Sequence, residues 1–301
     1  MPDRSAHLAG IGLMLLATLM FSLNDVLGKW LVGTYSVGQI LFLRSIAALI
    51  MLSPFIWRAG WTAFRHAPHP GLQVLRALFA TTEVACFYLS VWYLPLADAM
   101  TFYLASPIYV TAMSALFLGE RVGRFRWTAI IVGFVGVLIA LGPSADSFGT
   151  GSMIALAGSF IYALSLILTR KVKATHNAVL ATTQSLGSLA FGAIAAPLTW
   201  VPVASNAHYL LLLVLGAVSI AAIVCVNHSL RLAPASVVVP YQYTLIVWAI
   251  ILGFAAFGDT PQLHTLVGAA IIVASGLVIF LREQHLGRSP EDKPTFVEPA
   301  A

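Results

Sequence analysis

Four charged side chains lie inside long apolar stretches of this 301-residue chain: Asp25, Arg44, Arg76 and Glu83. An ionised group at the centre of a lipid bilayer costs at least about 2.5 kcal/mol, so charges in such stretches are usually functional or paired. Carboxyl groups can bind cations or exchange protons, and a guanidinium can bind anions or neutralise a carboxylate. These four residues are therefore the first candidates for binding or proton chemistry.

Asp25 and Arg44 are predicted to lie near each other. Asp25 is about six residues from the end of one apolar segment and Arg44 about eight residues from the start of the next, so their depths match within roughly one helical turn. The spacing of Thr18, Ser22, Asp25 and Lys29 places all four on one helix face, which should point toward the protein interior. We predict an Asp25–Arg44 ion pair in the outer half of a cavity. A purely structural charge network is the alternative.

Glu83 lies about twelve residues into a predicted helix of about twenty-four, close to the bilayer midplane. Arg76, Glu83 and Ser90 are spaced by seven residues and therefore share one face. Desolvation at the midplane favours the neutral carboxyl, which suits a group that takes up and releases a proton. We predict that Glu83 is a coupling or substrate-recognition carboxylate, with the polar segment 241–243 opposite it. The alternative is a structural Glu83 neutralised by Arg76 or by another helix.

Two prolines interrupt apolar segments, Pro107 in the first half of the chain and Pro240 in the second. A proline leaves an upstream carbonyl unpaired, and such breaks occur where a helix lines a cavity. Tyrosine and glutamine side chains near these prolines can bind a planar or polar organic molecule, or they can be satisfied by neighbouring helices. The residues that we predict to line a cavity here are Tyr103, Tyr241, Gln242 and Tyr243.

The elements that must position these residues follow from the composition. Hydrophobic residues make up 59% of the chain and charged residues only 9%, against roughly 25% charged residues in an ordinary soluble domain. Apolar runs of about twenty residues, long enough to cross a bilayer as helices, recur between short polar breaks. The sequence therefore predicts an all-α polytopic membrane protein with ten transmembrane helices. We place them near residues 8–31, 36–57, 71–94, 96–118, 126–142, 150–169, 177–199, 208–230, 235–257 and 262–281.

The net charge of +5 does not indicate a nucleic-acid partner, because the Lys and Arg residues lie mainly in alternate breaks between the apolar segments. Arg58 and Arg65 occupy one such break, and Arg170 and Lys171 occupy another. Cation-rich loops stay in the cytoplasm, so the pattern places both termini on the cytoplasmic side of a cell inner membrane. Residues 282–301, which carry charges and prolines, are predicted to be a disordered cytoplasmic tail.

The chain also repeats itself. Ala97-Asp98, followed by an apolar stretch and Glu120, is matched some 138 to 140 residues later by Ala235-Ser236 and Asp259. A unit of five helices has an odd number of crossings, so the two copies run in opposite directions through the membrane. Inverted repeats of this kind are typical of transporters, in which two similar halves open a central site to either side. The alternative is an old duplication retained for packing alone.

Signals for other chemistry were sought in the sequence and not found. Cys86 and Cys225 have neither metal nor disulfide spacing. There is no phosphate-binding Gly-Lys-Ser loop and no H-E-x-x-H motif, so we expect no metal, no cofactor, no enzyme activity and no ATP-driven transport. Small residues such as Ala129, Gly136 and Gly268 permit close helix approach, either within the chain or in a homodimer.

At several motifs the chain resembles the EamA domain of the drug/metabolite transporter superfamily, and it does so twice, between about residues 8 and 282. The resemblance implies two inverted five-helix repeats, 8–142 and 150–281, with both termini cytoplasmic and a central cavity open alternately to each side. Asp259, where glutamate is common, and Ala129, where glycine is common, are mild departures. The matching motifs are Tyr93-Leu-Pro-Leu-Ala-Asp-Ala, Leu118-Gly-Glu120-Arg, Gly136-Val137, Ala233-Pro-Ala-Ser, Pro240-Tyr-Gln-Tyr, Phe257-Gly-Asp259-Thr-Pro261 and Ser275-Gly276.

The resulting functional hypothesis is secondary transport of a small metabolite across the cytoplasmic membrane by alternating access. Resemblance to the family implies substrates such as amino acids, nucleotide-like cofactors, toxic metabolites or vitamins including riboflavin. Two alternatives stay open at this point, a non-transporting membrane scaffold or assembly protein and an intramembrane enzyme. The fold is better specified than the cargo, because one scaffold can serve many substrates.

Overall fold

The computed structural model describes residues 4–117, 124–141, 149–172, 175–233 and 238–287. Every regular element in these ranges is a helix, which confirms the predicted all-α fold class. Seven of the described helices are long and apolar enough to cross a membrane, and two shorter apolar helices accompany them. The elements are α1 (Arg4–Val32), α2 (Val37–Arg65), α3 (Pro70–Tyr93), α4 (Leu96–Leu104), α5 (Ser106–Phe117), α6 (Arg124–Leu141), α7 (Thr150–Lys171), α8 (Asn177–Ala195), η2 (Ala196–Leu198), α9 (Asn206–Leu232), η3 (Val239–Tyr243), α11 (Thr244–Phe257) and α12 (Leu263–Gly287).

The two helices that contain the key prolines are broken, as predicted. The segment expected over 96–118 forms α4 and α5, which meet at Ala105, and Pro107 is the second residue of α5. In the second half, Pro240 lies in the short 3-10 helix η3, and α11 begins only at Thr244. A proline lacks the amide proton that would continue the helix, and its ring clashes with the preceding turn. Both breaks therefore have a local cause in the sequence.

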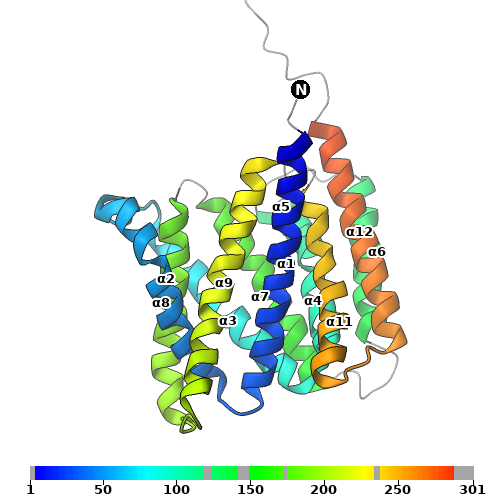
Figure 1. Cartoon of the computed structure of the whole chain (residues 1–301). Helices are drawn as coiled ribbons and strands as arrows, with labels where there is room; N and C mark the ends of the chain where they lie inside the picture. Colours follow the sequence, from blue (N-terminus) through cyan, green and yellow to red (C-terminus); the bar gives the residue numbers. More distant parts are fainter. Residues whose placement is uncertain (1–3, 118–123, 142–148, 173–174, 234–237, 288–301) are drawn as a thin grey trace, which may run out of the picture.

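Two helices extend beyond the predicted membrane segments. α2 continues to Arg65 but changes direction at Gly60, whose φ of 72° is not helical, and its last turns project from the bundle (upper left in Figure 1). α12 continues to Gly287, so residues 282–287 are helical and the prediction of disorder from residue 282 is wrong for them. They include good helix formers such as Leu, Arg, Glu and Gln, which can extend a helix past the apolar layer. Residues 288–301 lie outside the described part of the chain.

Helix ends are set by local capping. The Ser36 side chain accepts a hydrogen bond from the Gln39 amide at 3.3 Å, and the Ser205 side chain accepts one from the His208 amide at 3.4 Å. Ser36 thereby caps an amide of the first helical turn, and the His208 amide is shared between the Ser205 side chain and the Ser205 backbone carbonyl, which lies at 3.1 Å. At the C-terminal end of α11, Gly258 takes the left-handed conformation with φ of 69°, which glycine adopts without steric cost.

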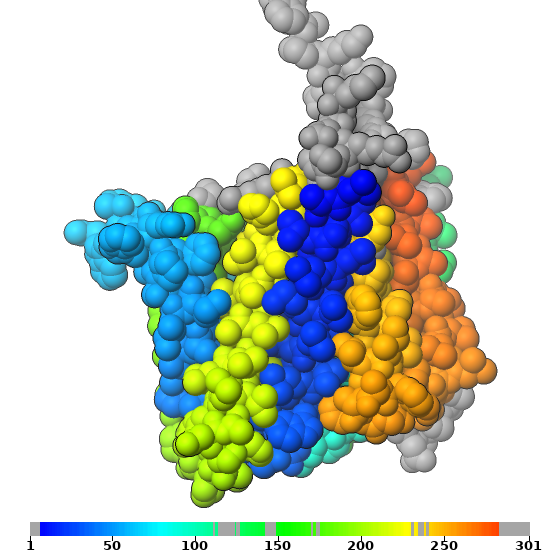
Figure 2. Space-filling view, in the orientation of Figure 1, coloured from blue at the N-terminus to red at the C-terminus, as the bar shows by residue number. Residues whose placement is uncertain are grey.

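The helices lie side by side in one bundle, and most contacts join the first half of the chain to the second (Figure 1). α1 packs on α9, α2 on α8, α3 on α7, α4 on α11 and α6 on α12. The face drawn in Figure 2 shows α1 (blue) lying against α9 (yellow) along most of their length. The two described chain ends, at the start of α1 and the end of α12, lie at the same end of the bundle, the top in Figure 1.

Small residues hold α6 and α12 together. A Cβ added at Gly268 would lie 2.6 Å from the Gly136 carbonyl oxygen and 2.6 Å from the Ala140 Cβ. Further along α12, the Ser275 hydroxyl donates a hydrogen bond to the Ala129 carbonyl oxygen at 2.5 Å. The small residues that suggested a homodimer therefore serve a contact within one chain, where close approach replaces large side chains.

Large apolar side chains cover the outside of the bundle. Trp57 is 86% exposed, Leu198 81% and Leu263 76%. A soluble protein rarely presents so many large apolar groups together, whereas lipid solvates them. Polar residues gather instead between the helices, where Ser22, Gln39 and Thr101 are fully buried. The bundle is thus apolar outside and partly polar inside.

Candidate functional site

A cavity of about 670 Å³ lies inside the bundle and is lined by residues from both halves of the chain. This volume is in the range of sites that take small organic molecules. Its charged lining residues are the predicted Asp25, Arg44 and Glu83. Three helices, α1, α2 and α3, bring these residues together, although they lie far apart in the sequence.

One face of α1 forms a wall of the cavity, as its polar stripe predicted. Thr18, Asn24 and Asp25 line the cavity, while Ser22 is fully buried behind it. The Thr18 hydroxyl lies 3.0 Å from the Thr244 hydroxyl at the start of α11. The Asn24 amide donates to the Leu215 carbonyl of α9 at 2.5 Å. These contacts hold the part of α1 just before Asp25 to α11 and α9 of the second half.

Arg44 is bound to a tyrosine rather than directly to Asp25. Its Nη1 donates a hydrogen bond to the Tyr88 hydroxyl at 2.6 Å, and its guanidinium lies 5.4 Å from the centre of the Tyr88 ring. The predicted Asp25–Arg44 ion pair is therefore wrong as a direct contact, because within the described ranges Asp25 and Arg44 form no ion pair within 4 Å. Arg44 nevertheless shares the cavity with Asp25 and Glu83, and its charge acts on both carboxyl groups.

Glu83 faces the cavity without a bound partner. Within the described ranges, the carboxyl groups of Glu83 and Asp25 accept no hydrogen bond and form no ion pair. The expected alternative partner, Arg76, turns instead to α8, where its Nη2 donates to the Leu180 carbonyl at 2.5 Å and to the Thr183 hydroxyl at 3.0 Å. Arg76 thus joins α3 to α8 and does not neutralise Glu83. The two cavity carboxyls stay available to a ligand or a proton.

Aromatic rings complete the wall around Glu83. The Tyr103 hydroxyl donates to the Glu83 backbone carbonyl at 3.0 Å, which places α4 against α3 at this point. The Phe87 ring meets the Tyr103 ring edge-on at a centroid distance of 5.3 Å. Tyr162 of α7 lies 6.3 Å from Tyr103 on the other side. Three rings from three helices therefore surround one side of the carboxyl.

Three cavity tyrosines each lie against a helix glycine. A Cβ added at any of these glycines would overlap the tyrosine, so the ring occupies space that only glycine leaves open. The tyrosines therefore reach their positions because a facing helix lacks a side chain there. The pairs are Tyr88 with Gly28, Tyr103 with Gly158 and Tyr243 with Gly276.

The predicted cluster after Pro240 divides between the cavity and the core. Gln242 and Tyr243 line the cavity, as predicted. Tyr241 does not, and it packs instead against the apolar cluster of Met14, Ala233 and Val238. The short 3-10 helix explains this division, because its tighter winding turns neighbouring side chains to different sides.

Sequence reasoning missed several cavity residues. Tyr88 and Tyr162 are examples, and polar residues of α8, Gln184, Ser185 and Ser188, form a further wall. Ser185 and Ser188 are three residues apart, so their helical spacing was a usable signal. The tyrosines carried no such signal, since an aromatic residue in an apolar helix is more often part of the core. Glu120, a motif residue in the sequence, lies outside the described residues.

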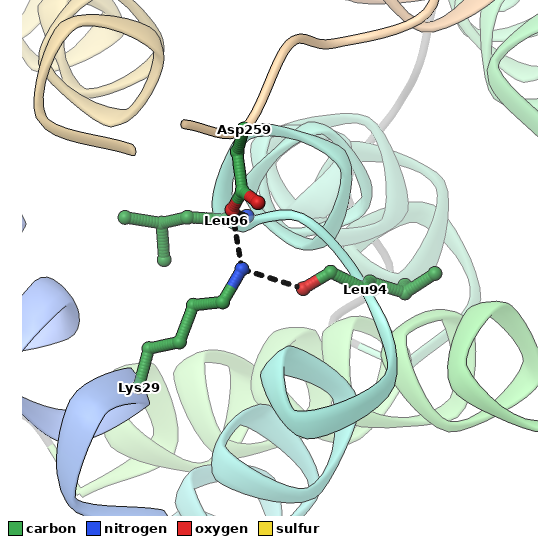
Figure 3. A network of polar contacts seen from close by, with 4 residues as sticks. All are labelled: Lys29, Leu94, Leu96 and Asp259. Atoms are coloured by element: carbon green, nitrogen blue, oxygen red, sulfur yellow. Dashed lines mark hydrogen bonds and ion pairs between the residues drawn. The ribbon is translucent and has the colours of Figure 1, made fainter. Parts of the chain in front are cut away.

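A second polar cluster lies where α1 ends, at the end of the bundle opposite the described chain ends, and its four residues are drawn in Figure 3. Lys29 forms an ion pair with Asp259, and its Nζ also donates to the Leu94 carbonyl at 3.1 Å. Asp259 in turn accepts from the Leu96 amide at 3.4 Å. These four residues, which we call the Lys29 cluster, join the end of α1 to the α3–α4 and α11–α12 connections. The side chains of Lys29 and Asp259 are only 13% and 21% exposed.

Comparison with known proteins identifies the family. The family model described as the EamA-like transporter family matches residues 8–142 and again residues 149–281. The chain belongs to this family. Membership in this family identifies the protein as an EamA-like transporter.

Similar proteins span nearly the whole EamA chain. The S-adenosylmethionine uptake transporter of Rickettsia conorii (strain ATCC VR-613 / Malish 7) is 25% identical, over 95% of this chain and 98% of its own. The riboflavin transporter of Rhizobium johnstonii (strain DSM 114642 / LMG 32736 / 3841) is 26% identical, over 96% of each. One crystal structure of a protein that is 19% identical has a TM-score of 0.61 and covers 94% of this chain and 98% of that chain, which supports the fold.

Proposed function

We propose that this EamA protein is a secondary transporter that moves a small polar metabolite by alternating access and binds it in the central cavity. The observation that carries the proposal is a cavity of about 670 Å³ in which Asp25 and Glu83 face the interior without ion-pair partners among the described residues. Buried charges of this kind are retained in membrane proteins mainly where a substrate or an ion passes.

The helix contacts support two inverted repeats of five helices each, residues 8–142 and 150–281. In this proposal α4 and α5 count as one crossing, as do η3 and α11, which makes ten in total. Exchange of the halves relates α1 to α7 and α3 to α9, so the α1–α9 contact corresponds to the α3–α7 contact. The same exchange swaps α2 with α8, α4 with α11 and α6 with α12, so each of these three contacts is unchanged by it. Two halves related in this way can exchange conformations around one central site.

We further propose that both termini face the cytoplasm and that the protein lies in the cell inner membrane. The described chain ends lie at one end of the bundle, and the cation-rich ends of α2 and α7 belong to the same set of connections. Cation excess on one side of a membrane protein marks the cytoplasmic side. On this assignment the Lys29 cluster lies on the outer side, where it closes that end of the bundle below the cavity.

Flux measurements with purified protein test the proposed function. Liposomes with the reconstituted protein should accumulate or release a radiolabelled cargo faster than empty liposomes. S-adenosylmethionine and riboflavin, which name the relatives, are the first cargoes to test, followed by amino acids and other vitamins. The matched control is the double variant Asp25→Asn, Glu83→Gln, which keeps side-chain size and removes both charges. Protein that folds normally and carries none of these solutes would contradict the proposal and favour a scaffold.

A further inference from the structure

We infer that the cavity takes a solute with a positively charged group and a flat ring, and that Asp25 and Glu83 bind the charged group. The inference rests on the proposed function, since it concerns the same cavity. It commits to a substrate class that neither the fold nor the family determines, because one scaffold serves many cargoes.

The balance of charge in the lining carries the first step. Two carboxyl groups, Asp25 and Glu83, face the cavity, and Arg44 is the cationic side chain among the described lining residues. One negative charge is therefore left over once a bound cation replaces the protons that desolvation would otherwise keep on the two carboxyls. In a site of low dielectric constant this excess is a strong attraction for a cation, because little water screens it.

Arg44 is positioned in a way that leaves the carboxyls uncovered. Its Nη1 donates to the Tyr88 hydroxyl at 2.6 Å, and its guanidinium lies over the Tyr88 ring. Gly28 of the opposite helix α1 leaves space for that ring, so the Tyr88 side chain is held in one position. The arginine is thus held against α3, and the carboxyls are not consumed by an internal ion pair within 4 Å among the described residues.

The rings beside Glu83 determine the shape of the bound group. Phe87, Tyr103 and Tyr162 come from three helices and lie within 5.3 to 6.3 Å of the next ring in the series. Aromatic faces attract both flat rings and cations, the first by offset or edge contacts and the second through the ring quadrupole. A solute with an amine and a ring therefore matches a wall that holds a carboxyl and aromatic rings together.

A matched set of ligands tests this inference whatever the natural cargo is. Tyramine, tyrosol and 4-hydroxyphenylacetate share one phenol ring and end in an amine, an alcohol and a carboxylate. Isothermal titration of the purified full chain should show tyramine binding about tenfold more tightly than tyrosol, and 4-hydroxyphenylacetate more weakly still. Phenethylamine and tryptamine, each with its matching acid, extend the comparison to other rings.

Variants of the cavity then assign the effect to its residues. Glu83→Gln and Asp25→Asn should each weaken tyramine binding about tenfold and leave tyrosol binding within about twofold. Asp98→Asn is the matched control, because Asp98 is a partly buried carboxyl of α4 outside the cavity lining. Its binding of all three ligands should equal that of the original protein.

The possible results separate this inference from the proposed function. Acids that bind as tightly as their amines, amines that bind no better than the alcohol, or no amine binding at all would each overturn the inference. Flux of an anionic metabolite in liposomes would leave transport standing and refute only the substrate class. Tight amine binding by a protein that carries no solute would support the substrate class and refute the proposed transport.

Discussion

The two groups of charged residues in this EamA protein differ in how fully they are paired. In the Lys29 cluster, each charge has both an ionic partner and a backbone partner, from three separate segments (Figure 3). In the cavity, Arg44 binds a tyrosine, and Asp25 and Glu83 face open space. Satisfied charges hold segments together, whereas unsatisfied ones are available to a ligand. This contrast agrees with the proposal that the Lys29 cluster closes one end of the bundle and that the cavity carboxyls bind the cargo.

The two groups lie close to each other along α1. Asp25 and Lys29 are four residues apart on the same face, which is about 6 Å along a helix. A movement of α1 that opens the Lys29 cluster therefore also moves Asp25. We expect substitutions in the cluster to affect conformation and stability first, and substitutions in the cavity to affect binding first.

The largest expected effect is that of Lys29→Ala. This change leaves Asp259 mostly buried without its ion-pair partner and should reduce stability by about 2 kcal/mol, less than a fully buried pair because some solvent reaches it. The loss should appear as a lower midpoint in thermal unfolding of the detergent-purified protein.

The double variant Lys29→Ala, Asp259→Ala should regain part of that stability, because it removes both charges. Lys29→Arg, which keeps the charge, is the control and should stay close to the original protein. If the double variant loses the sum of the two single stability losses, the two residues act independently, and the proposal that the Lys29 cluster closes this end of the bundle is wrong.

Glu83→Gln should have the next largest effect, on transport rather than on stability. The amide keeps the size of the carboxyl but cannot titrate, so flux should fall about tenfold and lose the part of its pH dependence that Glu83 contributes. The measurement is flux into liposomes between pH 5 and 8, with folding checked by thermal unfolding. Charged and titratable groups that also face this region, namely Asp25, Arg44, Cys86, Tyr88, Tyr103 and Tyr162, remain in the variant.

Glu83→Asp, which keeps a titrating carboxyl, should retain part of the pH dependence and serves as the control. If Glu83→Gln accumulates normally and transports with unchanged rate and pH profile, neither the coupling nor the recognition role of Glu83 can stand. A strong loss of stability with normal transport per folded molecule would instead place Glu83 with the structural charges of the Lys29 cluster.

A smaller effect is expected from Gly276→Ala. The added methyl would overlap the Tyr243 hydroxyl and displace that ring within the cavity. Overpacking of this kind costs about 1–3 kcal/mol when nothing else yields, and cargo binding should weaken a few-fold. Tyr243→Phe removes the overlapping oxygen, so the double variant should bind cargo better than Gly276→Ala alone. Equal binding in the single and double variants would show that Tyr243 does not shape the site.

Much of this architecture was predictable from the sequence because its causes are local. Apolar length determines a membrane-crossing helix, and proline chemistry determines the breaks beside Pro107 and Pro240. The inward face of α1 followed from the helical spacing of Thr18 and Ser22, both of which are buried. Asp25, Arg44 and Glu83 were recognisable as candidates for the same reason, since a charge in an apolar segment needs an explanation.

The errors at the helix ends show where local rules stop. α12 continues beyond the predicted end at residue 281 because helix-forming residues extend it past the apolar layer. Tyr241 was expected beside Gln242 in the cavity, but the tight winding of η3 directs it into the core. The small residues of α6 and α12 were open to two interpretations, and the structure shows one of them, close packing of these two helices within the chain.

The sequence by itself determined the solvent, the helices, their breaks and the set of charges that had to be inside. Only the tertiary structure decided which of those charges meet. Lys29 and Asp259 are 230 residues apart, and Arg44 and Tyr88 are 44 apart. Such contacts depend on how helices far apart in the sequence pack, between the halves for Lys29–Asp259 and within the first half for Arg44–Tyr88, and on glycines such as Gly28 that let a ring approach. No local spacing rule contains that information, because it arises only when those helices pack against each other.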